Sequence, residues 1–215
     1  MKNDSVIFVD KPAGITSFGV VARVRRRLSE ELGKKAKVGH TGTLDPFATG
    51  LMIIVTGKEC RNAMNYSKLD KEYEATIKLG ATSTTGDPEG EIISVSNHRP
   101  TLNEVKQALK GFVGTITQKP PIYSAIKING QRAYKMARKG EVIEMPLRQV
   151  TVNTLDLIDY QYPLIRIRAH VSSGTYIRSL AEDIGSVLQT GAYCTQLRRT
   201  KVGQWTVEQA IPIEK

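Results

Sequence analysis

A loop with one acid, one imidazole and three glycines is the part of this sequence best suited to chemistry. Residues 39–50 read Gly-His-Thr-Gly-Thr-Leu-Asp-Pro-Phe-Ala-Thr-Gly and contain His40 and Asp45. The glycines and the proline favour a shaped loop over a helix or a strand. A carboxylate held there can act as a nucleophile or a general base. Asp-Pro is also a common helix start, so a structural role stands beside the catalytic one.

Positive charge gathers just before this loop. Residues 23–37 carry seven Lys and Arg against two Glu, and the whole chain has 31 Lys and Arg against 21 Asp and Glu, for a net charge of +10. Such a surplus suits a phosphate backbone. The arginines lie on a predicted helix, where either a solvated face or contact with RNA explains them.

The elements around the loop are predicted from periodicity. Residues 5–10 read as a short buried strand, and the apolar run 51–55 as another. Between them, Ser17 is expected to cap a helix whose apolar positions recur at helical spacing, at Val20, Val21, Val24 and Leu28. A further helix is predicted over 59–69.

The next stretch alternates strictly. Over 71–79, Tyr73, Ala75, Ile77 and Leu79 share one face, which predicts a half-buried strand with Tyr73 at its start. By itself Tyr73 is readily explained as a core residue. Asp87 lies in an Asp-Pro-Glu-Gly turn, which makes it a weak catalytic candidate. Thr101 and Glu104 form a capping box that opens a helix with Phe112 on its apolar face, expected to end near Gly111 or Gly114.

Residues 118–130 form a second dense motif, Gln-Lys-Pro-Pro-Ile-Tyr-Ser-Ala-Ile-Lys-Ile-Asn-Gly. Its prolines favour an extended entry, and Asn-Gly favours a hairpin turn. The motif holds Tyr123 and Lys127 but no evident acid or base, so loop architecture and RNA contact are its expected roles. A helix is predicted over 131–139.

The last third of the chain supplies further cations. Residues 150–158 and 164–171 are predicted to pair as antiparallel strands, and 177–188 to form a helix. Arg178 falls in the first turn of that helix, where the helix dipole opposes a cation, so an anion is expected nearby. A strand over 191–203 carries Leu197 and a basic stripe at Arg198 and Arg199.

Composition excludes several classes of protein. Two isolated cysteines and three isolated histidines form no metal-binding spacing and fit a reducing compartment. No long apolar run or signal peptide is present, so we expect a cytoplasmic protein that does not bind membranes.

Five motifs together resemble one family. The loop at 39–50, Lys-Pro-x-Gly-x-Thr-Ser at 11–17, Lys-x-Tyr at 71–73, the run through 118–138 and Gly-Thr-Tyr-Ile-Arg at 174–178 are similar to those of the TruB-type pseudouridine synthases. The resemblance implies an α/β (α+β) fold: a central, mainly antiparallel mixed sheet flanked by helices, with the active-site cleft across it.

The resemblance also implies roles for individual residues. Asp45 is the catalytic residue, Tyr73 stacks on the target base, and Arg178 pairs with Asp45. Leu197 packs in the active-site pocket and His40 enters the RNA loop. The remaining positions, expected to contact RNA or to support the catalytic loop, are Lys11, Tyr123, Lys127, Arg198 and Arg199.

The implied reaction turns uridine 55 of the tRNA T-loop into pseudouridine. Asp45 either attacks as a nucleophile or takes a sugar proton. No metal or other cofactor and no protein partner is expected, and we expect a monomer. The chain is read as one catalytic domain over 1–215, without the RNA-binding PUA domain common in bacterial members. A non-catalytic tRNA-binding or tRNA-folding module, and the catalytic subunit of a guide-RNA-dependent pseudouridylase, are the alternatives.

Overall fold

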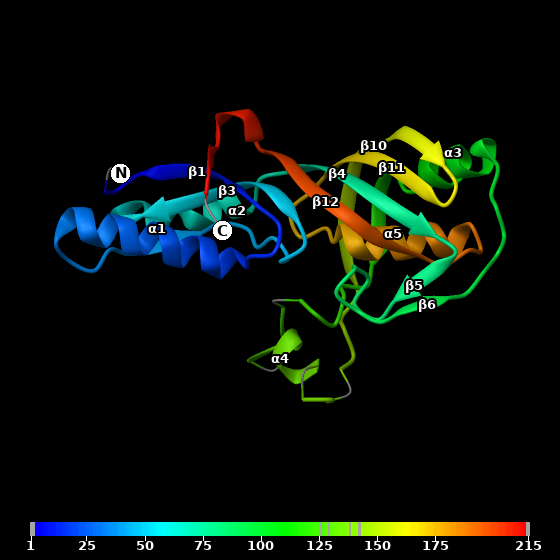
Figure 1. The fold of residues 1–215 in the computed structure, drawn as a ribbon, viewed down its shortest axis with the longest axis horizontal. Coiled ribbons are helices and arrows are strands. Elements are labelled where there is room, and N and C mark those ends of the chain that lie inside the picture. Colours follow the sequence, from blue (N-terminus) through cyan, green and yellow to red (C-terminus); the bar gives the residue numbers. More distant parts are fainter. Residues whose placement is uncertain (1–2, 125, 129, 138, 142, 214–215) are drawn as a thin grey trace. The chain divides into compact units, whose positions relative to one another are not determined.

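The computed structural model describes residues 3–124, 126–128, 130–137, 139–141 and 143–213 as a mixed α/β chain (Figure 1). The chain divides into two compact units. Unit 1 contains the residues up to Glu74 and those from Leu197 onward, and unit 2 runs from Ala75 to Gln196. Both boundaries fall inside strands, β4 (Lys71–Leu79) and β12 (Ala192–Val202).

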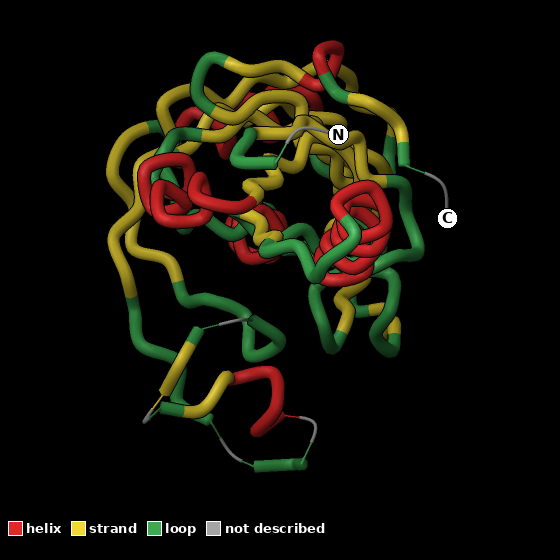
Figure 2. The backbone as a smooth tube through the Cα atoms, turned by 90° about the vertical axis from the view of Figure 1, so that its left-hand side faces the viewer, coloured by secondary structure: helices red, strands yellow, loops and turns green. Residues whose placement is uncertain are grey.

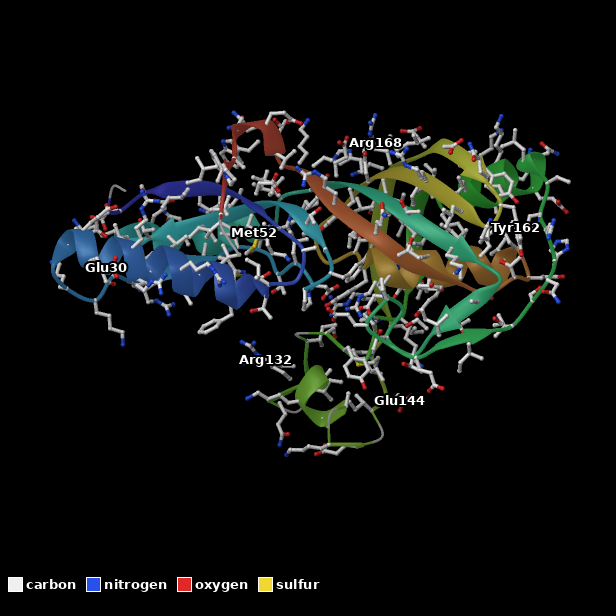
Figure 3. The ribbon with its side chains drawn as sticks, in the orientation of Figure 1. Glu30, Met52, Arg132, Glu144, Tyr162 and Arg168 are labelled. Carbon is white, nitrogen blue, oxygen red and sulfur yellow. The ribbon has the colours of Figure 1, made fainter. Side chains whose placement is uncertain are left out.

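Unit 1 is built on a mixed sheet. Its main strands lie in the order β14 (Ile211–Pro212), β1 (Val6–Lys11), β3 (Thr49–Thr56) and β12. β1 and β2 (Val38–His40) are antiparallel to β3, β12 is parallel to it, and β13 (Trp205–Thr206) pairs with β12. Met52 on β3 is fully buried (Figure 3), so the apolar run 51–55 is confirmed as a core strand.

The helices of unit 1 correct two predictions. α1 (Ser17–Leu32) buries the predicted apolar face, but its N-cap is Thr16, whose side chain accepts a hydrogen bond from the Gly19 N–H. Ser17 is therefore already inside the helix. The helix predicted over 59–69 is a 3₁₀ turn, η1 (Gly57–Asn62), followed by the short α2 (Ala63–Ser67). A second 3₁₀ turn, η2 (Val207–Gln209), precedes β14.

Unit 2 is built on a second run of strands, in which β10 pairs antiparallel with its two neighbours. Its sheet runs from β4 through β11 (Leu164–Val171) and β10 (Arg148–Gln161) to β7 (Gly114–Gln118). The β10–β11 pair is the predicted one, and alternation leaves Arg168 on the exposed side of β11 (Figure 3). β7 was not predicted, and it pairs antiparallel with β10. A separate two-stranded sheet joins β5 (Ala81–Ser83) and β6 (Ile92–Ser94).

The two longer helices of unit 2 agree with the sequence prediction. α3 (Leu102–Lys110) has the capping box of Thr101 and Glu104, and its C-cap is Gly111, one of the two predicted ends. α5 (Ile177–Val187) buries Ile177, Leu180, Ala181 and Ile184. Because these apolar residues face the core, they fix the rotation of α5 about its axis and with it the direction of the Arg178 side chain.

The hairpin and short helix that lie between β7 and β10 extend away from the sheet of unit 2 (Figure 2). The predicted hairpin is present as β8 (Lys127–Ile128) paired with β9 (Gln131–Arg132). The helix predicted over 131–139 is shorter, since α4 spans Ala133–Ala137 after β9, and Arg138 lies outside the described residues. Helices flanking mixed sheets confirm the predicted fold class; the single domain over 1–215 and the cleft stay predictions.

Candidate active site

The loop that carries Asp45 connects β2 to β3 in unit 1. It begins after His40 and ends at Thr49. The Ala48 N–H donates to the Asp45 carbonyl over 3.1 Å, so the Asp-Pro pair closes a tight turn. Residues 41–48 contain no helical residue, so the reading of Asp-Pro as a helix start is wrong. Asp45 is instead held in an irregular, hydrogen-bonded loop.

Lys11 supports this loop from the interior of unit 1. Its side chain is fully buried, and its ammonium donates to the carbonyls of Pro12, Ile15 and Pro46 at 2.9, 2.8 and 3.1 Å. The Gly14 N–H also donates to the Pro46 carbonyl, over 2.9 Å. A buried cation is stable when such acceptors replace its water. The expected RNA contact of Lys11 is therefore corrected. Its ammonium lies inside the protein and supports the loop at Pro46, the residue after Asp45, which is the other role expected for its motif.

Arg199 holds the other end of the loop. It is 2% exposed, and its Nε donates to the Leu51 carbonyl over 2.7 Å while Nη2 donates to the Gly42 carbonyl over 3.1 Å. Gly50 lets the main chain of Arg199 lie close to β3, because a Cβ at this position would lie 2.3 Å from the Arg199 carbonyl oxygen. The expected RNA contact of Arg199 is therefore also corrected.

Strand alternation could have shown this. Neighbouring residues of a strand point to opposite faces, so Arg199 shares the inward face with Leu197, which is 7% exposed. Arg198 points the other way and forms a partly exposed ion pair with Asp10 at 2.7 Å. The basic stripe is thus two different sites, and only Arg198 is available to solvent.

Ser17 makes a further tie to the loop. Its hydroxyl donates to the Leu44 carbonyl over 2.8 Å and accepts from the Leu44 N–H over 2.7 Å. The residue next to Asp45 is therefore fixed through both of its main-chain groups. This explains why Ser17 cannot serve as the helix cap.

Tyr73 lies near the start of β4 and is 8% exposed. Two residues earlier, Lys71 is buried, and its ammonium donates to the carbonyls of Ser67 and Leu69, each over 2.5 Å. Burial, with the nearby Arg199 guanidinium, lowers the pKa of Lys71 to about 8. A third buried cation thus anchors the chain where it enters the strand that carries Tyr73.

Arg178 is a buried cation of unit 2. It is 3% exposed, and Nη1 donates to the Thr85 carbonyl over 2.7 Å and to Asp87 Oδ2 over 3.2 Å. Nη2 donates to the Tyr123 carbonyl over 2.9 Å. The expected anion is therefore present, as the buried carboxylate of Asp87. Pairing of Arg178 with Asp45, which belongs to the other unit, stays a prediction.

Asp87 is more than a turn residue. Its Oδ1 accepts from the Thr85 hydroxyl over 2.6 Å and from the Glu89 N–H over 3.0 Å. Turn chemistry was therefore read correctly, while burial and the pairing with Arg178 were missed. No short-range pattern signals a contact across 91 residues of sequence.

The remaining candidates divide between the units. Unit 1 holds Asp45, His40, Tyr73 and Leu197, and unit 2 holds Arg178, Tyr123 and Lys127. Lys127, on β8, is exposed, as an RNA contact requires. Within the described ranges there is no cluster of three His, Cys, Asp or Glu residues that could hold a metal ion. None of the described helices is long and apolar enough to span a membrane.

Two family models match the chain. The model of the TruB family pseudouridylate synthase N-terminal domain matches residues 26–177, and that of the tRNA pseudouridylate synthase B C-terminal domain matches residues 178–215.

Curated relatives named tRNA pseudouridine synthase B match as well. That of Phocaeicola vulgatus is 45% identical, with 99% of this chain and 92% of that protein covered. That of Corynebacterium glutamicum strain R is 44% identical, with 98% and 71% covered.

Among solved structures, this chain is similar to a chain of the crystal structure of a Cbf5-Nop10-Gar1 complex. The TM-score is 0.75, and the identity is 30% over 98% of this chain. An H/ACA RNP bound to a substrate RNA containing 2′-deoxyuridine gives a TM-score of 0.71 and 28% identity over 97% of this chain. The chain spans about half the length of the matched chain in each, 53% and 51%.

Proposed function

The chain belongs to the TruB family of pseudouridylate synthases, and we propose that it converts uridine 55 in the T-loop of tRNA to pseudouridine. The observation that carries this proposal is the Asp45 loop, whose sequence resembles the signature loop of the family. The buried side chains of Ser17 and Lys11 bond to its main chain at Leu44 and Pro46, on either side of the acid. Similarity over almost the whole chain to enzymes named for this activity supports the choice of tRNA.

The reaction begins when the uridine leaves the RNA stack. Inside a folded loop neither C1′ nor C5 of the nucleotide is open to a side chain, so the base must flip out. Tyr73 stacks on the flipped base, Leu197 packs beside it, and His40 enters the RNA loop. Lys127, Arg198 and Tyr123 contribute RNA contacts.

Asp45 then breaks the N-glycosidic bond. It acts either as the nucleophile or by removing a sugar proton, and both roles need an ionised carboxylate. The buried ammonium of Lys11 donates to the carbonyl of Pro46, the residue after Asp45, and so fixes the main chain beside the acid. The freed uracil turns and joins the ribose through C5, and a base removes the C5 proton. Arg178, by pairing with Asp45, would orient the carboxylate.

We further propose that the protein works in the cytoplasm as a monomer, on bare tRNA, without a guide RNA or protein partner. The net charge of +10 suits direct capture of RNA phosphates. A non-catalytic tRNA-binding module would need the same charge but would not need an acid held in a shaped loop.

The test is conversion of a T-arm stem-loop RNA by the purified chain alone. We expect pseudouridine at the T-loop uridine and none in a matched RNA with cytidine at that position. Binding without conversion would leave the binding module, whereas conversion only after adding a guide RNA and partner proteins would identify the guided enzyme. Either result overturns the proposal.

A further inference from the structure

We propose that Gln118 is a positioning residue for Arg178, because its side-chain amide fixes the main chain at Tyr176, where α5 begins. This inference rests on the proposed function, in which Arg178 belongs to the active centre. It assigns a task to the last residue of β7, a strand that periodicity did not predict.

The contact uses both polar ends of the amide. Gln118 Nε2 donates to the Tyr176 carbonyl over 3.0 Å, and the Tyr176 N–H donates to Gln118 Oε1 over 2.8 Å. Gln118 is fully buried, so no water can replace either bond. A side-chain amide supplies, without a change of protonation, both the donor and the acceptor that this pair of bonds requires. The residue type is thus dictated by the backbone it meets, 58 positions away.

Tyr176 needs such a partner. It is the N-cap residue of α5 and has extended dihedral angles, φ −103° and ψ 112°, with no side-chain capping bond. The first N–H groups of a helix lack partners within the helix, so its entry is fixed by whatever restrains the cap residue. Arg178 follows two residues later, so a shift of the Tyr176 backbone moves the Arg178 side chain with it.

The segment after Gln118 completes the anchor. The Ser179 hydroxyl donates to the Lys119 carbonyl over 2.8 Å, and the Arg178 guanidinium donates to the Tyr123 carbonyl over 2.9 Å. The first turn of α5 is therefore tied to residues 118–123 at three points, with Pro120 and Pro121 stiffening the chain between them. Of these three contacts, the one made by Gln118 alone restrains the main chain of α5 on the N-terminal side of Arg178.

The test compares Gln118→Glu and Gln118→Met with Tyr160→Phe in the full chain. Tyr160→Phe is the matched control, because it removes a partly buried hydroxyl bond to the Pro100 carbonyl within the same unit. We expect the single-turnover rate on the T-arm stem-loop to fall about 10- to 100-fold in both Gln118 variants, as a small misplacement of a reacting group can cost. RNA affinity should change less than about twofold, and the control should keep the wild-type rate.

Gln118→Glu carries its own chemical signature. The ionised carboxylate places an oxygen against the Tyr176 carbonyl, whereas the protonated form restores an O–H donor. The rate of this variant relative to wild type should therefore recover as the pH falls from 8 to 6. Should neither variant fold, Ser179→Ala removes the neighbouring tie, and we expect a two- to fivefold loss of rate.

Two results are kept apart. If wild type does not convert the RNA, the proposed function fails. If wild type converts it but folded Gln118 variants react within twofold of Tyr160→Phe, or Ser179→Ala stands in and keeps the wild-type rate, the inference about Gln118 is overturned.

Discussion

The Asp45 loop and the Arg178 corner, where Arg178 meets residues 85–87 and Tyr123, hold functional side chains by different means. At the Asp45 loop, the buried cations Lys11 and Arg199 bond to main-chain carbonyls of the loop and its flanks. At the Arg178 corner, the functional residue is itself the buried cation, and it bonds to carbonyls and to the Asp87 carboxylate. The first arrangement shapes backbone around an acid, and the second aims a guanidinium.

This difference shows what each buried cation fixes. Lys11 and Arg199 bond to main-chain carbonyls of the loop and its flanks, so they fix the course of the backbone. Asp87 compensates Arg178 directly and sits in its own turn, held by Thr85 and Glu89. The loop thereby gains a fixed backbone around its acid, while the corner gains a fixed side-chain geometry. Variants at each site should separate these effects.

The largest expected effect is at Arg178. Arg178→Met leaves the Asp87 carboxylate buried without its cation, which typically costs about 3–5 kcal/mol of unfolding free energy. Adding Asp87→Asn removes that charge and should recover about 1–2 kcal/mol, as contacting residues couple. Denaturant unfolding of Arg178→Met, Asp87→Asn and the double variant measures this. Strictly additive losses would show that Asp87 is not the partner that matters.

Arg199→Met should cost somewhat less, about 2–4 kcal/mol. The substitution removes the hydrogen bonds to the carbonyls of Leu51 and Gly42, and each lost bond costs about 1–3 kcal/mol. These partners are carbonyls and carry no net charge, unlike Asp87. The conversion rate per folded molecule should also fall, since Gly42 lies in the Asp45 loop. Arg198→Met, at the partly exposed neighbouring position, is the control, and we expect it to lose less than 1 kcal/mol. Equal losses would contradict the inward placement of Arg199.

Lys71 makes the buried charge of unit 1 sensitive to pH. Its pKa is lowered in the folded state to about 8, from 10.5. Between these values the unfolded chain binds a proton that the folded chain does not, so this group makes stability rise with pH, by up to about 1 kcal/mol per pH unit. Unfolding of wild type and Lys71→Met at pH 8, 9 and 10 should show the steeper rise in wild type. Parallel curves would mean that Lys71 titrates normally.

The smallest expected effects come from two adjacent hydroxyls. Thr16→Ala removes the cap of α1 and should cost about 1 kcal/mol with little change in conversion. Ser17→Ala frees both main-chain groups of Leu44 and should cost about 1–2 kcal/mol and slow conversion several-fold. The pair is matched in position and side-chain type, so comparing their rates isolates the tie to the loop. A slower Thr16 variant would reverse the assignment.

Much of the fold follows from sequence patterns that extend over many residues. The face of α1, the alternation of β4, the capping box of α3 and the β10–β11 pair were all predicted because each is a local, repeated signal. Short strands such as β7 and β2 were missed, since five or three residues give little periodicity and their partners are distant.

The site was harder to predict than the fold. Resemblance pointed to Asp45, Tyr73 and Arg178, but Lys11 and Arg199 were taken for RNA contacts because a cation in sequence looks solvent-exposed. Strand alternation places each on the same face as a buried apolar residue, Val9 and Leu197. Asp87 and Gln118 carry no comparable signal, because their contacts join segments far apart in the chain.

The most direct test of the account is a comparison of wild type and Asp45→Asn under single-turnover conditions with the T-arm stem-loop. Asparagine keeps the size of the side chain but lacks the negative charge and basicity that both proposed roles need. We predict a rate at least about 10³-fold lower, with RNA binding unchanged within twofold. An Asp45→Asn protein that converts the RNA at more than a tenth of the wild-type rate would contradict the assignment of the reaction to this loop.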